Sequence, residues 1–566
     1  MIPMRVGPLV RATTMTTAVI WAEFYQPGNI TLSAAPSVAP STPTLTTSAH
    51  TVNVGGRFYV ALQLTDLQPA TWYTYQLESL ADQAASEQAS AQTGLRPPRY
   101  QCFRTLATKA EEHSPAQENS LRIAYGSCRD LRIPERDSFS AFGAWLLEHV
   151  SQRDTFWPHL LLLIGDQIYA DEPSASFLQL YPDLQKGAQT FENFASMYTY
   201  AWTTDEQTRQ VLAALPTYMI FDDHEITNNF NISPTWRARA LRKGREHLLV
   251  DGLVSYWIYQ GWGNLYQRDP SQHPLLRIMY QAALSGEDAL EALRTCISSA
   301  LYEQTRLTWH YEIPTTPSIF VMDVRADRTA IFNSQTAFTE TPTSIMHPDQ
   351  MQQLASWLYE NQVTPAILVS SVPILLPPLI GLAEYLMGIR PCHKSIAPLR
   401  WLGRQVARVQ HKLAMGTSFD HWPVFNTTWR NLVDLLGKSR QDILVLSGDV
   451  HFSYAMQARR TKKSTHDAHI YQLVSTPLQN ELSPNSRKLI LGQARLHQAT
   501  YGGLHTRMLP MYTSKHKQRV PHDMLLQTNI ALVTLQSQAG GKYEIQQVYL
   551  GFVEDKMDVV GQTIIE

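Results

Sequence analysis

The 566-residue chain has few cysteines and no excess of charge of either sign. Its cysteines lie far apart, at Cys102, Cys128, Cys296 and Cys392, and no CxxC pair occurs. A zinc ribbon and a disulfide framework are therefore not expected. The formal net charge is −2, and no basic stripe interleaved with aromatic residues is present, so nucleic acid is not an expected partner.

The N-terminus also lacks a charged region followed by an apolar run. We therefore expect a cytoplasmic protein, or a periplasmic or secreted one if a leader has been removed. A long apolar stretch begins at Ala366, but it contains three prolines and Glu384. A spanning helix tolerates that pattern poorly. We expect a buried strand, an apolar loop and a short helix, with contact to a membrane surface through residues 374–390 as the alternative.

The hydrophobic pattern divides the chain into two regions of different texture. Residues 1–107 alternate apolar and polar side chains between turn signals, which predicts a small β-sandwich. Residues 108–120 are polar and indicate a linker. Residues 121–566 alternate short apolar strands with helical segments, which predicts a layered α/β domain. Two helical insertions are expected in that domain, at about 236–307 and 374–417.

Polar, metal-capable residues follow four of the apolar strands. They are Cys128 in YGSCRD, Asp166 and Tyr169 in IGDQIYADE, Asp222, Asp223 and His224 in FDDHE, and Asp449 and His451 in LSGDVHFS. Each segment alone has a simpler interpretation, such as a core thiol, a helix cap or a buried histidine. Loops at the carboxyl ends of strands form sites in α/β domains, and clustered buried charges need a partner such as a cation. Together the four segments predict a metal site.

This set of motifs resembles the PhoD-type alkaline phosphatases, a branch of the calcineurin-like (purple acid phosphatase-like) metallophosphoesterases. Further segments agree, including DVRADR from Asp323, the QMQQLASWL helix from Gln350 and FDHWPVFNTTWRNLVDLL from Phe419. The resemblance implies a four-layer α/β/β/α sandwich preceded by a fibronectin- or Ig-like β-sandwich. It covers most of the chain apart from the two insertions.

The resemblance also implies two metals. The first would be held by Cys128, Asp166, Tyr169 and His451, and the second by Asp166, Asp223 and Asp449, with Asn228 or Asn229 as an additional ligand. The family suggests ferric iron at the first site, where the thiolate and phenolate donors also allow zinc. The extra carboxylates of the second site fit calcium, with magnesium or manganese as alternatives.

The expected activity is hydrolysis of phosphate esters, through in-line attack by water activated at a binuclear centre. His224 would donate a proton to the leaving oxygen, and Arg129 would contact a phosphate oxygen. Glu225 would orient His224 or a metal ligand, and Asp222 would likewise lie next to the ligands without binding the metal. Phosphomonoesters, phosphodiesters and phospholipid head groups are alternative substrates. A non-catalytic protein that binds a partner or a glycan is the alternative from another class.

Overall fold

The computed structural model describes most of the chain. The residues outside the description are 1, 38–43, 82–94, 109–119, 134–135, 232–235, 237–239, 267–268, 270, 272, 303, 329–343, 362, 364, 389–419, 462–467, 494–495, 514–517, 539–541 and 566. Most of the predicted linker and the greater part of the second predicted insertion therefore lie outside the described residues.

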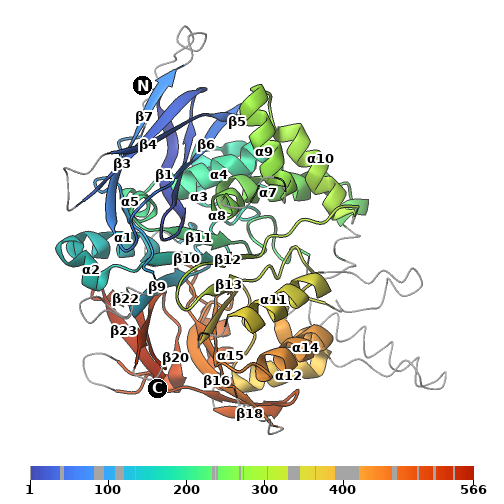
Figure 1. Ribbon diagram of the computed structural model, residues 1–566. Helices are drawn as coiled ribbons and strands as arrows, with labels where there is room; N and C mark the ends of the chain where they lie inside the picture. The colour runs from blue at the N-terminus through green and yellow to red at the C-terminus, as the bar shows by residue number, and fades with distance from the viewer. Residues whose placement is uncertain are drawn as a thin grey trace.

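Two four-stranded sheets form the N-terminal region (Figure 1). One contains β1 (Met4–Thr13), β2 (Ala18–Phe24), β6 (Arg57–Leu64) and β5 (Val52–Val54), and the other contains β4 (Leu45–His50), β3 (Gly28–Pro36), β7 (Trp72–Ala81) and β8 (Cys102–Arg104). Alternate residues of β3, including Ile30 and Leu32, are buried in one hydrophobic cluster with Ile20 of β2 and Val60 of β6. The period-2 pattern thus brings the two sheets face to face.

Two larger sheets form the centre of the molecule. The six-stranded sheet has the order β11 (Thr217–Ile220), β10 (Leu160–Ile164), β9 (Ser120–Gly126), β21 (Asn529–Ser537), β22 (Tyr543–Val553) and β23 (Lys556–Ile565). The nine-stranded sheet has the order β12 (Tyr311–Ile313), β13 (Ile319–Val321), β14 (Ala366–Ser370), β15 (Ile443–Ser447), β17 (Ile470–Val474), β16 (Ser453–Arg460), β19 (Leu504–Met508) and β18 (Gln498–Tyr501), with β20 (Met524–Leu525) paired to β16.

The central strands of the nine-stranded sheet, β13, β14, β15 and β17, are buried on both faces. In β15, Leu444 and Leu446 belong to the cluster that also contains Leu161 of β10, whereas Ile443 and Val445 belong to a second cluster. That second cluster includes Trp429, which lies on a covering helix. Successive side chains point to opposite faces, so an uninterrupted apolar strand packs against the other sheet on one side and helices on the other.

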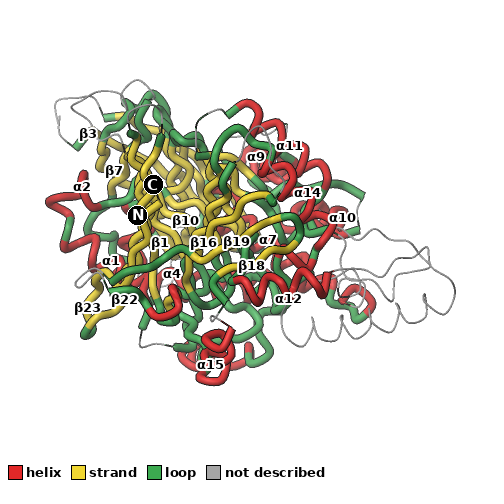
Figure 2. The backbone as a smooth tube through the Cα atoms, turned by 90° about the horizontal axis from the view of Figure 1, so that it is seen from below, coloured by secondary structure: helices red, strands yellow, loops and turns green. Residues whose placement is uncertain are grey.

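The helices lie around the sheets, as Figure 2 shows. They are α1 (Ser138–Glu148), α2 (Arg153–Phe156), α3 (Ala175–Leu180), α4 (Phe191–Thr203), α5 (Glu206–Ala214), α7 (Glu246–Tyr256), α8 (Trp262–Leu265), α9 (Pro274–Ser285), α10 (Leu290–Leu301), α11 (Pro348–Glu360), α12 (Pro378–Gly388), α14 (Asn426–Gly437) and α15 (Pro484–Gln493). Helices α7 to α10 fall within the first predicted insertion. The predicted α/β class is confirmed.

The apolar stretch after Ala366 forms β14, a buried loop and α12. Ile374, Leu375 and Leu376 are fully buried. None of the helices in the described part of the chain has the length and hydropathy needed to cross a bilayer.

Candidate metal centre

The four polar segments meet because of how their strands are paired. β9, β10 and β11 are parallel neighbours, so the segments after them leave the same edge of the six-stranded sheet. The fourth segment follows β15 of the other sheet, and the Asp449 N–H donates to Ser127 Oγ across the gap at 3.0 Å. A Cβ on Gly448 would lie 2.1 Å from that oxygen, so only glycine permits this approach.

Four of the six predicted metal ligands have left-handed backbone conformations. The φ angles are 59° at Cys128, 53° at Asp166, 70° at Asp449 and 59° at His451. Such conformations are unfavourable for residues other than glycine and concentrate at functional sites. Gly165, before Asp166, has φ 91°, and a Cβ there would lie 2.6 Å from the Asp222 Cβ. The backbone is therefore bent to present these side chains.

The ligands predicted for the second metal lie together. Carboxylate oxygens of Asp166, Asp223 and Asp449 all fall within 4.8 Å of one another. Burial raises the pKa of Asp166 well above its usual range, and the Asp223 and Asp222 carboxylates add to that effect. A cation among the three would offset this repulsion, so the donor set fits a hard metal ion.

Among the ligands predicted for the first metal, Tyr169 and His451 both contact Asn480, and Cys128 contacts Asp449 of the second set. The Cys128 thiol donates to the Asp449 carbonyl oxygen at 3.6 Å. The Asn480 side-chain amide donates to the Tyr169 hydroxyl at 2.8 Å and lies 3.5 Å from His451 Nε2. Burial raises the pKa of both the Cys128 thiol and the Tyr169 phenol well above their usual ranges. A bound cation would favour their ionised forms, as metal ligation requires.

Glu225 holds the loops that carry two of the carboxylates. It is fully buried, and its oxygens accept hydrogen bonds from the backbone N–H groups of Asp166 at 2.9 Å, Gln167 at 2.7 Å and Asp222 at 2.8 Å. The Gln260 side chain donates a further bond at 3.1 Å. The structure thus places Glu225 behind the ligand loops, where it fixes their backbone rather than the His224 ring.

His224 lies at the edge of the cluster. Its Nδ1 is 2.8 Å from Asp171 Oδ1, and its ring centroid is 4.3 Å from that of Tyr169. Burial opposes the charged imidazole, but the carboxylates of Asp223, Asp171 and Asp166 raise the pKa of His224 well above its usual range. Asp171 therefore orients one ring nitrogen, a role that the sequence did not predict.

Arg129 does not have the role predicted for it. Its guanidinium donates to Asp137 Oδ2 at 2.7 and 3.0 Å, to the Ala201 carbonyl at 2.7 Å and to Thr208 Oγ1 at 2.9 Å. Asp137 is the N-cap of α1, so Arg129 ties that helix to the carboxyl end of α4. Every guanidinium nitrogen already has an acceptor, and the prediction of a phosphate contact is corrected to a structural role.

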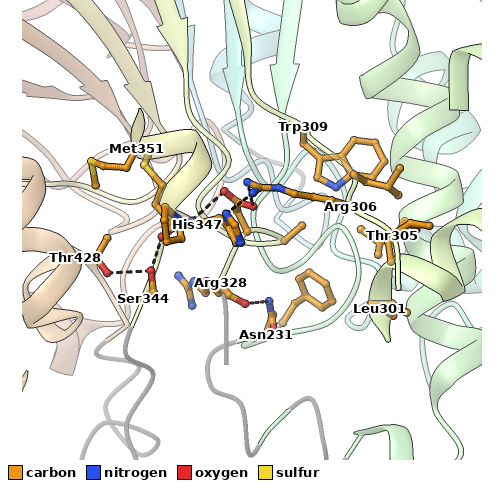
Figure 3. Close-up of a pocket in the computed structure, with 18 of the residues that line it drawn as sticks. Asn231, Leu301, Thr305, Arg306, Trp309, Arg328, Ser344, His347, Met351 and Thr428 are labelled. Atoms are coloured by element: carbon orange, nitrogen blue, oxygen red, sulfur yellow. Dashed lines mark hydrogen bonds and ion pairs between the residues drawn. The ribbon is translucent and has the colours of Figure 1, made fainter. Parts of the chain in front are cut away.

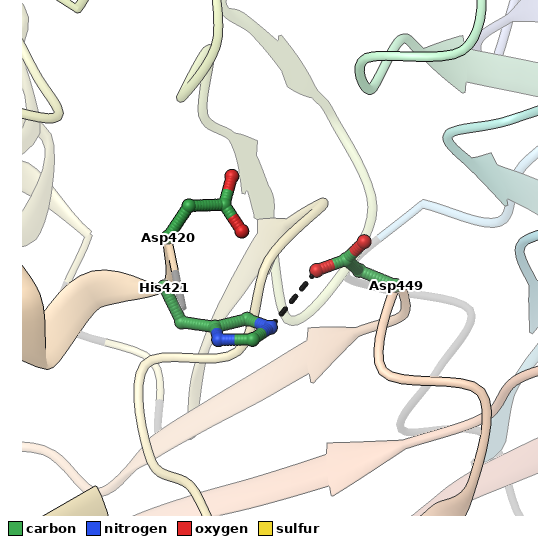
Figure 4. Close-up of side chains that lie close together, drawn as sticks. All are labelled: Asp420, His421 and Asp449. Carbon is green, nitrogen blue, oxygen red and sulfur yellow. Dashed lines mark ion pairs between the residues drawn. The ribbon is translucent and has the colours of Figure 1, made fainter. Parts of the chain in front are cut away.

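Three further residues join the cluster, and the sequence analysis assigned none of them to the site. His421 Nε2 lies 3.0 Å from Asp449 Oδ2 (Figure 4). Its Nδ1 lies 2.6 Å from Glu384 Oε1. Asp420, next to His421, contributes a carboxylate oxygen that lies within 4.8 Å of ligand atoms of His421 and Asp449. The signals available were the FDHW segment and the glutamate inside the apolar stretch, which lies on α12 and is fully buried.

A buried guanidinium lies between these carboxylates. Arg325 bonds Asp222 through Nε, donates to Asp420 Oδ2 at 2.5 Å, and lies 3.7 Å from Asp223 Oδ1. It is also 3.9 Å from Asp449 Oδ1. The Arg325 guanidinium lies on one side of the cluster and compensates part of the negative charge of the carboxylates.

Asn228 and Asn229 take part through their backbones. The Asn228 N–H donates to Asp171 Oδ2 at 2.8 Å, and the Asn229 N–H donates to Asp223 Oδ2 at 2.5 Å. Their side chains as metal or substrate ligands stay a prediction.

Comparison with known proteins shows which families and folds this chain resembles. Residues 123–250 match the PhoD-like phosphatase family, and residues 1–97 match a domain of unknown function, DUF7800. The solved structure of PhoD is 13% identical, with a TM-score of 0.57, and the match covers 100% of this chain and 90% of that one. The sensor domain of the anti-sigma factor RsgI4 from Pseudobacteroides cellulosolvens is 19% identical, and the match covers 20% of this chain and 98% of that one. Its TM-score of 0.14 is too low to indicate a shared fold.

No curated protein matches the chain. The segment matched by the family contains the GSC, GDQIY and DDHE motifs, which are the segments gathered at the edge of the six-stranded sheet. The resemblance seen in the sequence is therefore confirmed: residues 123–250 match the PhoD-like phosphatase family, and the fold of the chain is similar to that of PhoD.

Proposed function

We propose that the chain is a metal-dependent phosphoesterase whose centre takes two cations. The observation that carries this proposal is the meeting of Asp166, Asp223 and Asp449, with their carboxylate oxygens within 4.8 Å of one another. The family match implies hydrolysis of phosphate esters and supports catalysis over the non-catalytic alternative.

Two ligand sets share Asp166. Cys128, Tyr169 and His451 would complete the first, which suits ferric iron or zinc, and Asp223 and Asp449 the second, which suits calcium, magnesium or manganese. When bound, such cations supply the positive charge that polarises a phosphoryl group and activates water. The bent backbone at Cys128, Asp166, Asp449 and His451 holds the donors in place beforehand, which lowers the cost of ordering them.

Elemental analysis together with chelation tests this assignment. Purified protein should contain metal and hydrolyse nitrophenyl phosphate, and it should lose both after chelation. His451→Ala should reduce both the metal content and the rate, whereas His505→Ala, on β19 beside the edge strand β18, should change neither. A His451→Ala protein that keeps its full metal complement would remove His451 from the ligand set.

His224 is proposed to donate a proton to the leaving oxygen. Asp171 holds its Nδ1 at 2.8 Å, so the other ring nitrogen is the one available to substrate. His224→Ala should lower kcat on alkyl phosphates by about a hundredfold, the usual size of general acid catalysis, and lower it much less on nitrophenyl phosphate. The better leaving group needs no proton, so an equal loss on both esters would contradict the role.

A phosphodiester presented at a lipid surface is a second candidate substrate. Helix α12 reaches the centre through Glu384 and exposes Leu379 and Leu386, which are 41% and 53% accessible. Within the predicted membrane contact of residues 374–390, we therefore propose that the face of α12 with these two leucines contacts the lipid. Leu386→Ser should then weaken binding to phospholipid vesicles without changing hydrolysis of nitrophenyl phosphate. Hydrolysis of nitrophenyl phosphate but not of its bis-nitrophenyl ester would count against the diester.

A further inference from the structure

A cavity of about 870 Å³ lies between the helical region α7–α10 and helices α11 and α14, as bounded by the described residues (Figure 3). Ligand sites in proteins usually have volumes of roughly 300–1,000 Å³ and mainly apolar walls. Here Phe230, Leu253, Ile297, Trp309 and Met346 form an apolar inner surface. The cavity therefore has the size and character of a site for an organic group.

The cavity shares a wall with the candidate metal centre. Asn231 and Arg328 line it and are almost fully buried. Asn231 Nδ2 donates to the Arg325 carbonyl at 2.9 Å, and Arg328 Nη1 donates to Asp420 Oδ2 at 3.2 Å. Arg325 and Asp420 belong to the carboxylate cluster itself. One layer of side chains thus separates the cavity from the centre.

The chain order explains this proximity. Phe230 and Asn231 follow the FDDHE segment, and the Asn229 N–H donates to Asp223. Thr428, on the opposite wall, lies in the helix that follows Asp420. The loops that leave the metal centre therefore continue directly into the walls of the cavity.

One polar group in the wall is poised for a ligand. Arg306 pairs with Asp327 at 3.2 Å and also with His347 and Asp349. Its Nε is buried and has no hydrogen-bond partner within the described part of the chain. Buried donors are normally satisfied, so this one could bond an oxygen of a bound molecule. The other charges of that wall are paired, which does not favour a second anionic group.

We propose that this cavity receives the organic group of the phosphate ester, and that this group is large and mainly apolar, either aromatic or branched aliphatic. The inference rests on the proposed phosphoesterase function and adds its substrate class. Asn231 and Arg328 are almost fully buried between the cavity and the centre, so an ester held at the centre reaches the cavity only if these two side chains move aside. Burial of the apolar surface of its organic group then contributes to binding.

Filling the cavity tests the proposal. Ala300, half-buried on α10, lines the cavity, whereas Ala292 is exposed on the same helix and does not. Ala300→Phe should raise KM for 1-naphthyl phosphate by about tenfold, the usual effect of misfit in an apolar pocket. It should leave kcat/KM for glycerol phosphate within about twofold, because that ester does not use the cavity. Ala292→Phe, the matched control, should resemble the wild type on both esters.

Two results would overturn the proposal: an equal loss on both esters, or no change on either. If Ala300→Phe does not fold, Thr305→Phe at the exposed rim replaces it. Calorimetric titration with 1-naphthol separates this inference from the proposed function. If the metal-loaded wild type hydrolyses neither ester, the proposed function fails. In that case the cavity is still supported as a site for an organic group only if 1-naphthol binds the wild type and Ala292→Phe but not the variant that fills the cavity.

Discussion

Glu225 shows how a single residue orders several ligands at once. Its carboxylate accepts hydrogen bonds from three backbone N–H groups in the loops that carry Asp166 and Asp222, and it is fully buried. A carboxylate offers enough lone pairs for these donors, whereas a neutral amide presents an NH₂ group to some of them. The geometry of the centre therefore depends on a residue that binds the ligand loops through their backbone N–H groups.

We expect Glu225→Gln to weaken both the fold and the centre. At least one buried N–H would lose its acceptor, which costs about 2 kcal/mol of unfolding free energy. Urea denaturation measures that loss, and elemental analysis should show less bound metal. Glu291→Gln, at a side chain that is 78% exposed, is the matched control and should change neither quantity. A Glu225→Gln protein with unchanged stability and metal content would show that the ligand loops keep their conformation without the Glu225 carboxylate.

Arg129 and Arg325 show the limit of sequence reasoning for single residues. Arg129 follows the ligand Cys128 directly, yet the left-handed turn at Cys128 directs its guanidinium to Asp137 and α1. Arg325 is distant in sequence from every predicted ligand, yet it lies among four aspartates. Adjacency along the chain fixes which residues are near a site, but backbone turns decide which side chains face it.

At the scale of elements, strand pattern and strand order have different origins. The uninterrupted apolar runs of β10, β14 and β15 predicted buried strands, and each is buried along its length. The order of the strands depends on crossovers that local pattern does not record. β9, for example, pairs with β10 on one side and with β21, which lies near the end of the chain, on the other.

His159 links three elements and gives a pH dependence to the fold. Just before β10, its Nδ1 accepts the Arg122 N–H at 3.0 Å, and its Nε2 lies 2.7 Å from Arg104 Nη1 of β8. Burial lowers the pKa of His159 well below 6.5, and the cations of Arg122 and Arg104 lower it further. The fold therefore favours the neutral ring.

This shift predicts acid sensitivity at the junction of β8, β9 and β10. The neutral ring's contribution is fully present above the unfolded pKa of 6.5 and is lost as pH falls below it toward the folded value. His159→Gln stays neutral and should show a smaller decrease in urea midpoint between pH 7 and about pH 5. His247→Gln, at an exposed position, controls for the loss of one histidine. If the urea midpoint of His159→Gln decreased with falling pH as much as that of the wild type, His159 would not be the source of the acid sensitivity.

At the scale of the whole molecule, the N-terminal sheets are joined to the region that carries the site. Arg11 of β1 is fully buried and donates to the Gln260 carbonyl at 2.5 Å and to Asn264 Oδ1 at 2.9 Å. Asn264 also bonds both backbone groups of Met219 in β11, the strand that precedes FDDHE. The N-terminal region thus supports the strand that presents Asp223, although its sequence shows no catalytic cluster.

Metal removal should destabilise the entire fold, since the clustered carboxylates repel one another without a cation. A metal that binds only the folded chain stabilises it by about 2.7 kcal/mol at a hundred times its Kd. The chelated protein should therefore unfold at a lower Tm, and the Tm should rise with added calcium or manganese. Potassium at matched ionic strength controls for screening. Identical Tm values with and without metal would exclude a centre of this kind.

The sequence by itself determined the α/β class, the buried strands and the polar residues that follow four of them, because hydrophobic periodicity and side-chain chemistry are local properties. Tertiary structure alone decided that those strand ends meet, that Arg325, His421 and Glu384 join them, and that Arg129 does not. Those outcomes depend on strand order, on backbone turns such as the one at Cys128, and on contacts between residues hundreds of positions apart, for which a local pattern holds no record.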